Sequence, residues 1–250
     1  MKILFLGYDA RYEVLISELS SKYEIDSIGY NNSDIKINDI KNMNDYNIIV
    51  LPMSGIKNNY AGNVLIPNNL LDNYTGLIYT GNTKGLTEKC LKGNVESFLS
   101  DKEIVKNNTI ITVDGIMDRI KDIDKVIICI LGYGNIGSML YDKLVNNYKV
   151  IVGVKDNEVG VVEGSFSTSN KKDLEYALLS SDLIINTVPS HIIDEDILNN
   201  IDCYFLDVAS FPYGVDEKKI TNYKFRYDLY SSIPSKYAPI KAGKILLKKF

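Results

Sequence analysis

Residues 125–137 read Lys-Val-Ile-Ile-Cys-Ile-Leu-Gly-Tyr-Gly-Asn-Ile-Gly, an apolar run that breaks into glycines at Gly132, Gly134 and Gly137. The run predicts a buried strand, and the residues that follow predict a helix over 138–145. In a dinucleotide site the first glycine allows the tight turn, the second lets the backbone approach a pyrophosphate, and the third lets the helix pack on the strand. The stretch therefore favours a dinucleotide-binding turn. The alternative is a structural turn that binds no ligand.

The start of the helix completes this predicted phosphate site. Exposed N–H groups at a helix N-terminus attract an anion, and the helix dipole adds favourable charge. We therefore expect Asn135 and Ile136 to contact the cofactor together with the three glycines. A second apolar strand over 149–154 follows at the distance that such a unit requires.

The bulk composition limits the kinds of partner. The chain has 250 residues, is 45% hydrophobic and carries a net charge of -4, which is typical of a globular protein and argues against a surface for polyanions. The basic cluster at Lys241, Lys244, Lys248 and Lys249 is expected to be the solvated face of a terminal helix. We therefore expect neither a nucleic-acid nor a membrane partner.

The cysteines and the N-terminal segment bear on the compartment. Cys90, Cys129 and Cys203 lack metal or redox spacing, and two of them lie within apolar runs. No stretch has the length of a membrane span, and the apolar start of the chain is too short for a signal peptide. We expect a cytoplasmic protein without a metal site.

The chain contains an internal repeat. Residues 5–8, Phe-Leu-Gly-Tyr, match residues 130–133, Ile-Leu-Gly-Tyr, at an offset of 125, and Tyr23 and Tyr148 keep the same offset. Each half then continues with an amphipathic helix and a second strand. The repeat predicts two related α/β units.

The predicted fold is α/β, with two Rossmann-like, doubly wound parallel-sheet domains and a cleft between them. Further strands are expected over 47–51, 76–79, 183–186 and 204–208. The expected boundaries are a flavodoxin/Rossmann-like substrate domain over 1–108, a connecting helix over 109–123, a dinucleotide-binding domain over 124–235, and a C-terminal helix over 236–250 that packs back on the first domain.

The repeat fails at the phosphate positions. Asp9 and Tyr12 occupy the positions equivalent to Gly134 and Gly137, so the first half should not bind a second dinucleotide. Asp9 is interpreted as a helix N-cap. Arg11 is a candidate to hold a substrate carboxylate in a bidentate pair; the alternative is a surface arginine.

The end of the second strand decides between the two nicotinamide cofactors. NAD-selective sites place an acidic residue there, and this strand ends Val-Gly-Val before Lys155 and Asp156. Lys155 would attract a 2′-phosphate, so NADP(H) is favoured. A shift of one or two residues in register would make Asp156 the ribose ligand and leave NAD(H) possible.

Two polar segments follow the predicted strands at the carboxyl edge of the sheet, where the nicotinamide end of the cofactor is expected. Pro189 restricts the first segment, and Thr187 and Ser210 are candidates to hydrogen-bond a ribose or carboxamide. The alternative for each hydroxyl is a role in a turn or a helix cap.

Two residues are candidates for proton transfer. His191 is the single histidine and changes protonation near neutral pH. Asp114, at the start of the connecting helix, is its rival. The alternatives are a surface or capping role for His191 and an N-cap role for Asp114.

Taken together, the segments resemble the A subunits of dipicolinate synthase, the dehydrogenase-like half of a bacterial spore enzyme. The Gly132 loop is generic, whereas the Asp9-Ala10-Arg11 turn and the Ala238-Pro239 segment are more particular. The remaining similar segments are 52–54, 112–115, 186–190, 206–210 and 242–243.

The resemblance implies a reaction, a partner and a setting. The reaction is the oxidation and dehydration of a hydroxylated tetrahydrodipicolinate from the lysine pathway to dipicolinate, with reduction of a nicotinamide cofactor. The implied partner is a flavoprotein-like B subunit, and the implied setting is the mother cell of a sporulating bacterium. We also expect a homo-oligomer.

Several positions depart from the family pattern. Tyr12 stands where the resemblance leads us to expect Gln, Phe211 where it leads us to expect Arg, and Ile240 where it leads us to expect Lys. Asp114 replaces an expected Glu. A dicarboxylate needs cations, so two alternatives stay open: a dehydrogenase of another small carboxylate, and a cofactor-binding regulatory or scaffold subunit without turnover.

Overall fold

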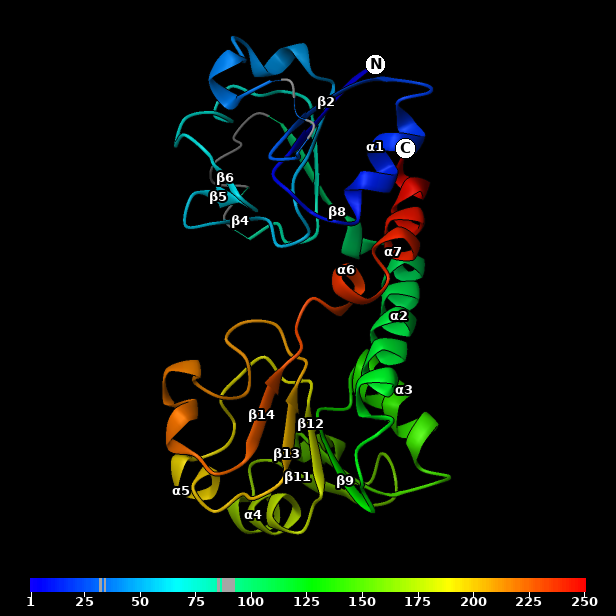
Figure 1. Cartoon of the computed structure of the whole chain (residues 1–250), viewed down its shortest axis with the longest axis vertical. Helices are drawn as coiled ribbons and strands as arrows, with labels where there is room; N and C mark the ends of the chain where they lie inside the picture. Colours follow the sequence, from blue (N-terminus) through cyan, green and yellow to red (C-terminus); the bar gives the residue numbers. More distant parts are fainter. Residues whose placement is uncertain (32, 34, 85, 87–92) are drawn as a thin grey trace. The chain divides into compact units, whose positions relative to one another are not determined.

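The computed structural model describes residues 1–31, 33, 35–84, 86 and 93–250 (Figure 1). The chain forms two units. Unit 1 comprises Met1–Asn108 and Ala238–Phe250, and unit 2 comprises Thr109–Tyr237. Cys90 lies outside the described residues, so its predicted lack of a redox role is not addressed by the structure.

Unit 2 is built on one parallel sheet in the order β11-β10-β9-β12-β13-β14. By sequence within the unit this order is 3-2-1-4-5-6, that of the dinucleotide-binding doubly wound fold, with its switch point between β9 and β12. The strands are β9 (Ile127–Leu131), β10 (Lys149–Val154), β11 (Ser165–Ser167), β12 (Leu183–Asn186), β13 (Tyr204–Asp207) and β14 (Arg226–Leu229). The helices are α2 (Lys102–Ile120, which begins in unit 1), α3 (Asn135–Leu144), α4 (Lys171–Leu179), α5 (Glu195–Leu198) and α6 (Ile233–Tyr237), with 3₁₀ turns η4 (Asp156–Glu158) and η5 (Glu217–Asn222).

Helices cover both faces of this sheet (Figure 1). On one face, α2 and α3 bury Ile116 and Leu140 against Ile130 of β9. On the other face, α4 and α5 bury Leu178 and Ile197 among the side chains that point the opposite way. Two-sided burial explains why the central strands are continuous apolar runs.

Unit 1 contains a second parallel sheet in the order β2-β1-β3-β7-β8 and a small antiparallel sheet, β4-β5-β6. The parallel order is 2-1-3-4-5, that of flavodoxin-like folds. The strands are β1 (Lys2–Leu6), β2 (Glu24–Ile28), β3 (Ile48–Val50), β4 (Ile56–Lys57), β5 (Tyr60–Ala61), β6 (Val64–Leu65), β7 (Leu77–Thr80) and β8 (Asn94–Ser97). The helices are α1 (Tyr12–Leu19) and α7 (Pro239–Leu246), with 3₁₀ turns η1 (Ile37–Asp39), η2 (Met43–Asp45), η3 (Phe98–Ser100) and η6 (Leu247–Lys249).

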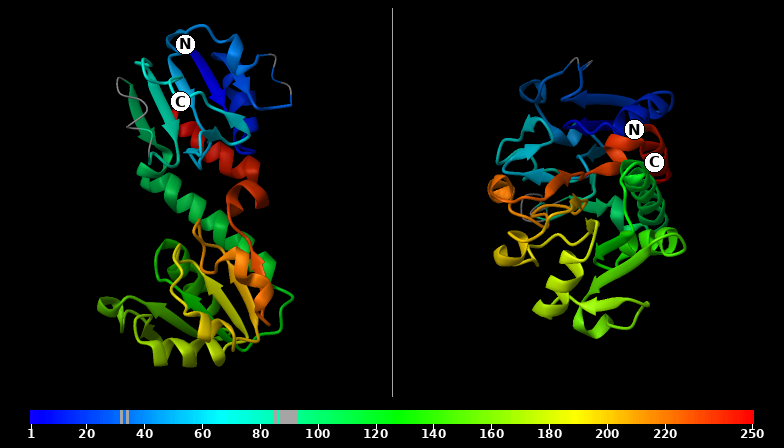
Figure 2. Two further views of the ribbon diagram at one scale, coloured as in Figure 1. Left: turned by 90° about the vertical axis from the view of Figure 1, so that its left-hand side faces the viewer. Right: turned by 60° about the horizontal axis from the view of Figure 1, so that its bottom comes forward.

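Helix α7 packs on α1 within unit 1 (Figure 2). A Cβ atom on Gly243 would lie 2.2 Å from the carbonyl oxygen of Arg11, so only glycine permits this close approach of the two helices. Beyond α7, the ring of Phe250 lies 6.4 Å from that of Phe5 and 5.5 Å from that of Tyr79, measured between centroids. The last residues of the chain thus belong to the core of its first half.

The repeat at an offset of 125 is present in the backbone. Strands β1 and β9 begin 125 residues apart, and so do β2 and β10. The N–H of Gly7 donates to Ile28 O at 2.9 Å, and the N–H of Gly132 donates to Gly153 O at 2.8 Å. The prediction of an α/β fold with two related parallel-sheet units is confirmed.

Two helix starts differ from the sequence prediction. Helix α3 begins at Asn135 rather than at Ser138. Helix α2 begins at Lys102 rather than at Thr109, because Asp101 accepts the N–H groups of Glu103 at 2.9 Å and Ile104 at 3.2 Å and so caps the charged stretch as helix. Residues 102–108, which the sequence predicted as the end of the first domain, thus form the start of α2.

Candidate functional site

The three glycines of the turn in unit 2 differ in their surroundings. Gly132 has φ +95°, and a Cβ there would lie 2.5 Å from Thr187 Oγ1. A Cβ on Gly137 would lie 2.0 Å from the carbonyl oxygen of Gly132, so this glycine permits the contact of helix with strand. A Cβ on Gly134 would meet no protein atom within 4 Å. Two of the glycines are therefore required by the fold, and Gly134 borders open space.

The start of α3 lies at this open space. Gly134 is the N-cap residue of α3, and both Gly134 and Asn135 are exposed. The first N–H groups of a helix have no carbonyl partner within it, so those of Asn135 and Ile136 are available to an anion. Ser138 does not take part, because its hydroxyl donates back to Gly134 O at 2.8 Å.

The end of β10 is the candidate contact for the cofactor ribose. The strand ends at Val154, and Lys155 follows as an exposed residue. Asp156, the acidic alternative, accepts a hydrogen bond from the hydroxyl of Ser167 at the end of β11. The first side chain beyond the strand is thus a cation, and the nearest carboxylate is already hydrogen-bonded.

The segment after β12 lies against the glycine turn. Thr187 donates twice to Leu131 O, from its N–H at 2.9 Å and from its hydroxyl at 2.8 Å. This contact fixes the segment at the switch point between β9 and β12, while the hydroxyl oxygen of Thr187 can still accept a hydrogen bond. Pro189 and, after β13, Ser210 are both exposed.

A buried polar cluster that the sequence did not predict lies at the same edge of the sheet. Asn186 and Asp207 are both fully buried, and Asn186 Nδ2 donates to Asp207 Oδ1 at 2.9 Å. The hydroxyl of Tyr227, on β14, donates to Asp207 Oδ2 at 2.9 Å. Burial, followed by the Asp207 carboxylate, raises the pKa of Tyr227, so its hydroxyl keeps its proton. The available signal was a polar residue at the end of each of two apolar strands.

His191 lies in the segment after β12 and contacts the segment after β13. Its Nε2 atom is 3.1 Å from Pro212 O, and the residue is exposed. The structure therefore brings His191 to the carboxyl edge, together with the glycine turn, Lys155 and Ser210.

Asp114 is not brought to this edge. It lies within α2, twelve residues after Lys102, so the N-cap interpretation is wrong. Its carboxylate pairs at 3.3 Å with Lys143, which lies in the last turn of α3. The first turn of α3 is about 12 Å away along that helix, at 1.5 Å per residue.

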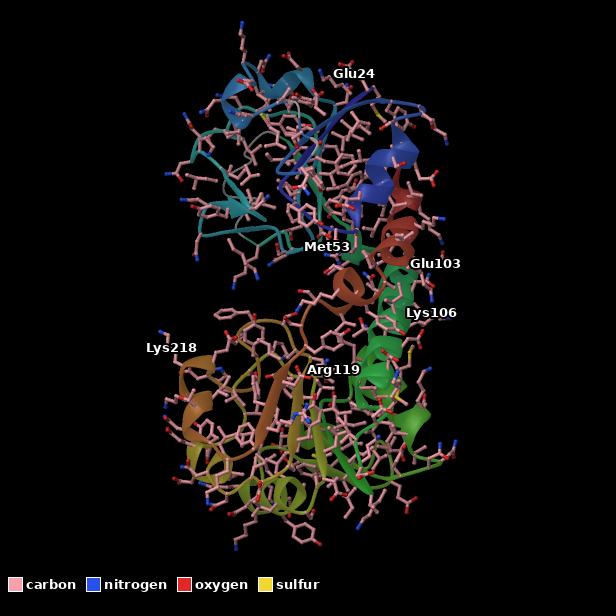
Figure 3. All side chains as sticks on the ribbon, viewed as in Figure 1. Glu24, Met53, Glu103, Lys106, Arg119 and Lys218 are labelled. Carbon is pink, nitrogen blue, oxygen red and sulfur yellow. The ribbon has the colours of Figure 1, made fainter. Side chains whose placement is uncertain are left out.

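Arg11 lies in unit 1, where it is paired with Asp9. Its Nε and Nη2 atoms donate to the two carboxylate oxygens of Asp9 at 2.7 and 2.6 Å. The N-cap position of α1 is Arg11 rather than Asp9, although Asp9 Oδ1 accepts the N–H of Arg11 at 3.2 Å, the kind of bond expected of a capping carboxylate. Asp9 also accepts the N–H of Met53 (labelled in Figure 3) at 3.1 Å. Tyr12 is fully buried and donates to Leu51 O at 2.9 Å.

The described part of the chain shows neither a metal site nor a membrane-spanning helix. Across those residues there is no group of three or more His, Cys, Asp or Glu side chains that could hold a metal ion. No helix among them combines the length and the apolar character needed to cross a bilayer. Two lysines of the basic cluster pair within unit 1, Lys248 with Glu103 and Lys249 with Asp101.

Comparison with known proteins gives a sequence relative and several similar structures. No protein-family model matches the chain. In sequence, it is 26% identical to the A subunit of dipicolinate synthase from Bacillus subtilis (strain 168), across 98% of this chain and 93% of that protein.

In structure, it is similar to the A subunit of dipicolinate synthase from Bacillus halodurans, with a TM-score of 0.80, 22% identity and coverage of 99% and 95% of the two chains. It is also similar to an NAD-dependent formate dehydrogenase of Staphylococcus aureus in complex with NAD, with a TM-score of 0.59, 14% identity and coverage of 99% and 92%. These likenesses show the two-domain α/β fold. The resemblance that the sequence predicted is confirmed: over nearly its whole length, this chain is similar to the A subunit of dipicolinate synthase.

Proposed function

We propose that this protein is an NAD(P)-dependent oxidoreductase of the dipicolinate synthase type. One observation carries the cofactor part of the proposal: at the switch point of a 3-2-1-4-5-6 sheet, Gly134 borders open space beside the first N–H groups of α3. An anion fits there, because no Cβ is present to exclude it and the helix dipole favours negative charge. The similarity to an NAD-bound dehydrogenase supports the same assignment.

Different residues would bind different parts of the cofactor. Asn135 and Ile136 would donate their N–H groups to the pyrophosphate, while Thr187 and Ser210 would present hydroxyl oxygens to the ribose or carboxamide. When bound, the nicotinamide supplies hydride acceptance. We propose NADP(H) as the preferred form, because exposed Lys155 directly follows β10 while Asp156 is engaged by Ser167.

The proposed reaction converts a 4-hydroxy-tetrahydrodipicolinate to dipicolinate. One water leaves, one hydride passes to the nicotinamide and one proton passes to a base, so that an aromatic ring forms. His191 is the proposed base, since it is the candidate that lies at the carboxyl edge. Arg11 is proposed for a substrate carboxylate: two of the five N–H donors of its guanidinium bond Asp9, and three remain.

A second protein is part of the proposal. The sequence relative is the A subunit of a synthase, which supports an accompanying B subunit. We propose that turnover in the cell, during sporulation and in the mother cell, uses such a partner.

Calorimetric titration with NADH and NADPH tests the cofactor part. We expect saturable binding of both, with NADPH bound more tightly. Folded protein that binds neither nucleotide at millimolar concentration would refute the proposal.

An assay with the hydroxylated tetrahydrodipicolinate tests the reaction. The expected product has the ultraviolet absorption of dipicolinate and forms together with reduced cofactor, with or without an added B subunit. Cofactor binding with no product under either condition would refute the dipicolinate assignment and leave a dehydrogenase of another small carboxylate.

One observation favours a non-catalytic alternative. Arg11 is held by Asp9, and Phe211, where the family resemblance leads us to expect a cation, is 70% exposed. The lack of a free cation at these two positions suits a cofactor-binding regulatory protein better than an enzyme for dicarboxylates. Tight dinucleotide binding without cofactor reduction by any candidate carboxylate would favour this alternative.

A further inference from the structure

The Asp207 carboxylate is surrounded by hydrogen-bond donors. Its Oδ1 accepts from Asn186 Nδ2 at 2.9 Å and from the N–H of Ala209 at 3.2 Å. Its Oδ2 accepts from the N–H of Gly214 at 2.6 Å and from the hydroxyl of Tyr227 at 2.9 Å. Four donors match the acceptor capacity of an ionised carboxylate, and none of the ion pairs among the described residues includes Asp207. The carboxylate is therefore held by neutral donors alone.

These bonds close the segment after β13. The bonds to Ala209 and Gly214 both return to the side chain of the last residue of β13, so residues 208–214 form a loop that is fastened at its base. A Cβ on Gly214 would lie 2.4 Å from Asn186 Nδ2, which shows how tightly the base is packed.

The segment after β12 is fastened to the same base. Asn186 Oδ1 accepts the N–H of Val188 at 3.1 Å, and Asn186 Nδ2 donates to Val188 O at 3.0 Å as well as to Asp207. The two segments meet again farther out, where His191 Nε2 lies 3.1 Å from Pro212 O. They are thus joined at two levels, once by Asn186 with Asp207 and once by His191 with Pro212.

The outer contact fixes the imidazole tautomer. A carbonyl oxygen can only accept, so Nε2 of His191 must carry the hydrogen. In the neutral ring Nδ1 is then the atom with a free lone pair. The carbonyl of Pro212 is presented by the loop that Asp207 closes.

We propose that Asp207 is a positioning residue that acts through the 208–214 loop to hold His191 as the Nε2–H tautomer, with Nδ1 as its proton-accepting atom. The consequence for catalysis rests on the proposed function, in which His191 is the base. The assignment of the tautomer does not rest on the proposed function, because each contact that supports it lies within unit 2.

Nuclear magnetic resonance of protein labelled with ¹⁵N-histidine tests the proposal without any cofactor. His191 is the single histidine, so both ring nitrogens are observed without overlap. We expect ¹⁵N chemical shifts of a protonated Nε2 and an unprotonated Nδ1 in the neutral ring and, at low temperature, a visible Hε2 signal, because the hydrogen bond to Pro212 O slows exchange of this proton with water.

Asp207→Asn turns one acceptor oxygen into a donor that faces other donors, and Tyr227→Phe removes one of the four bonds with little change of shape. The matched control is Tyr204→Phe, which removes a tyrosine hydroxyl that donates to Asp228 in the same sheet. We expect Asp207→Asn to lose the Hε2 signal, Tyr227→Phe to speed its exchange, and Tyr204→Phe to retain the wild-type signal.

An unchanged Hε2 signal in folded Asp207→Asn would overturn the proposal, and so would a wild-type ring protonated at Nδ1. If Asp207→Asn does not fold, Tyr227→Phe decides: faster exchange supports the proposal and wild-type exchange overturns it. These outcomes do not depend on whether a dinucleotide binds. If one does bind, Asp207→Asn should lower kcat and leave the affinity for ADP unchanged, because ADP lacks both the nicotinamide and the adjoining ribose that Ser210 of this loop is proposed to contact.

Discussion

The two glycine turns of this chain have nearly the same backbone, but different groups surround them. Gly7 and Gly132 have φ values of +94° and +95°, and both donate to a carbonyl at the end of the neighbouring strand. Both of these first glycines are closely packed: a Cβ on Gly7 would lie 2.2 Å from Ala61 O of the small sheet β4-β5-β6, and one on Gly132 would lie 2.5 Å from Thr187 Oγ1. The turns differ two residues later, where the Asp9 carboxylate is bonded by Arg11 in unit 1, whereas a Cβ on Gly134 in unit 2 would meet no protein atom within 4 Å.

The donors of the two turns differ in the same way. The N–H of Tyr8 donates to Asn63 Oδ1 at 3.0 Å, and Asn63 Nδ2 donates to Gly29 O at 2.7 Å, so an asparagine near β6 satisfies the turn of unit 1. In unit 2 the carbonyl that corresponds to Gly29 O, that of Val154, accepts the N–H and the hydroxyl of Thr168 at 2.9 and 3.1 Å, whereas the described residues supply no acceptor for the N–H of Tyr133, the counterpart of Tyr8. The backbone frame of a phosphate site and the capacity to bind a phosphate are therefore separate properties.

The largest effect is expected from a side chain that fills the open turn. Gly134→Val should weaken dinucleotide binding at least about 100-fold, because losing two charge-assisted hydrogen bonds of about 1.5 kcal/mol each corresponds to roughly that factor. The melting temperature should stay near that of the wild type, since Gly134 has φ -82° and open surroundings. Calorimetric titration and thermal unfolding measure the two. Wild-type affinity would show that the dinucleotide does not bind at the turn of unit 2.

The next largest effect should be on the stability of unit 2 and not on the binding of the dinucleotide. Gly137→Ala places a Cβ 2.0 Å from Gly132 O and should destabilise unit 2 by about 1–3 kcal/mol, the usual range for overpacking. Denaturant unfolding measures it. A free energy of unfolding equal to that of the wild type would contradict the structural role given to this third glycine.

A smaller effect is expected at the end of β10. Lys155→Ala should weaken NADPH binding about two- to fivefold, as loss of an exposed ion pair does, and leave NADH binding unchanged. Lys149→Ala, at the other end of the strand, is the matched control. An equal loss of affinity for NADPH and NADH would mean that Lys155 does not bind the 2′-phosphate.

The smallest effect concerns the side chains that accept the N–H groups at the start of the first strand of each unit. Asp182 accepts the N–H groups of Val126 and Ile127, both at 2.8 Å, whereas the equivalent acceptor in unit 1 is the neutral amide of Asn47, 2.8 Å from the N–H of Lys2. The bonds from Ile127 and Val126 lower the pKa of Asp182.

A lowered pKa in the folded state gives stability that is complete above the unfolded value, about 4 for Asp, and is lost as pH falls through the folded value. Asp182→Asn should therefore flatten the acid side of the stability curve of unit 2, and Asn47→Asp should add such a dependence to unit 1. Melting temperatures between neutral pH and acid record both changes. If the acid profile of Asp182→Asn matches that of the wild type, this contribution is absent.

The sequence predicted the central strands of the sheets and the features that depend on residues close in the chain. Strands β10 and β12 end where the apolar runs end, because both are buried on two faces. Strands β8, β11 and β14 were missed because they lie at sheet edges and are only partly buried, so their apolar signal is weak. The structural roles of Gly132 and Gly137 followed from spacing, because the turn and the contact between Gly137 and Gly132 O involve atoms that are close in the chain.

The rest of the site depends on pairings across the fold. Asn186 and Asp207 are 21 residues apart, and Tyr227 is 20 residues from Asp207 on a strand that had no clear signal. Arg11 was expected to offer its guanidinium to a ligand, but the partner found is Asp9, two residues away, because a turn brings both side chains to the same side. Spacing alone does not show which of several acceptors a side chain chooses.

The place of residues 238–250 in unit 1 has a consequence for synthesis. Ribosomes make the chain from the N-terminus, so β1 and α1 emerge long before the helix and the Phe250 ring that pack against them. The half of the protein that is translated first therefore completes its core last, after the whole of the other half has left the exit tunnel. During that interval the nascent chain exposes the face of α1 that α7 later covers.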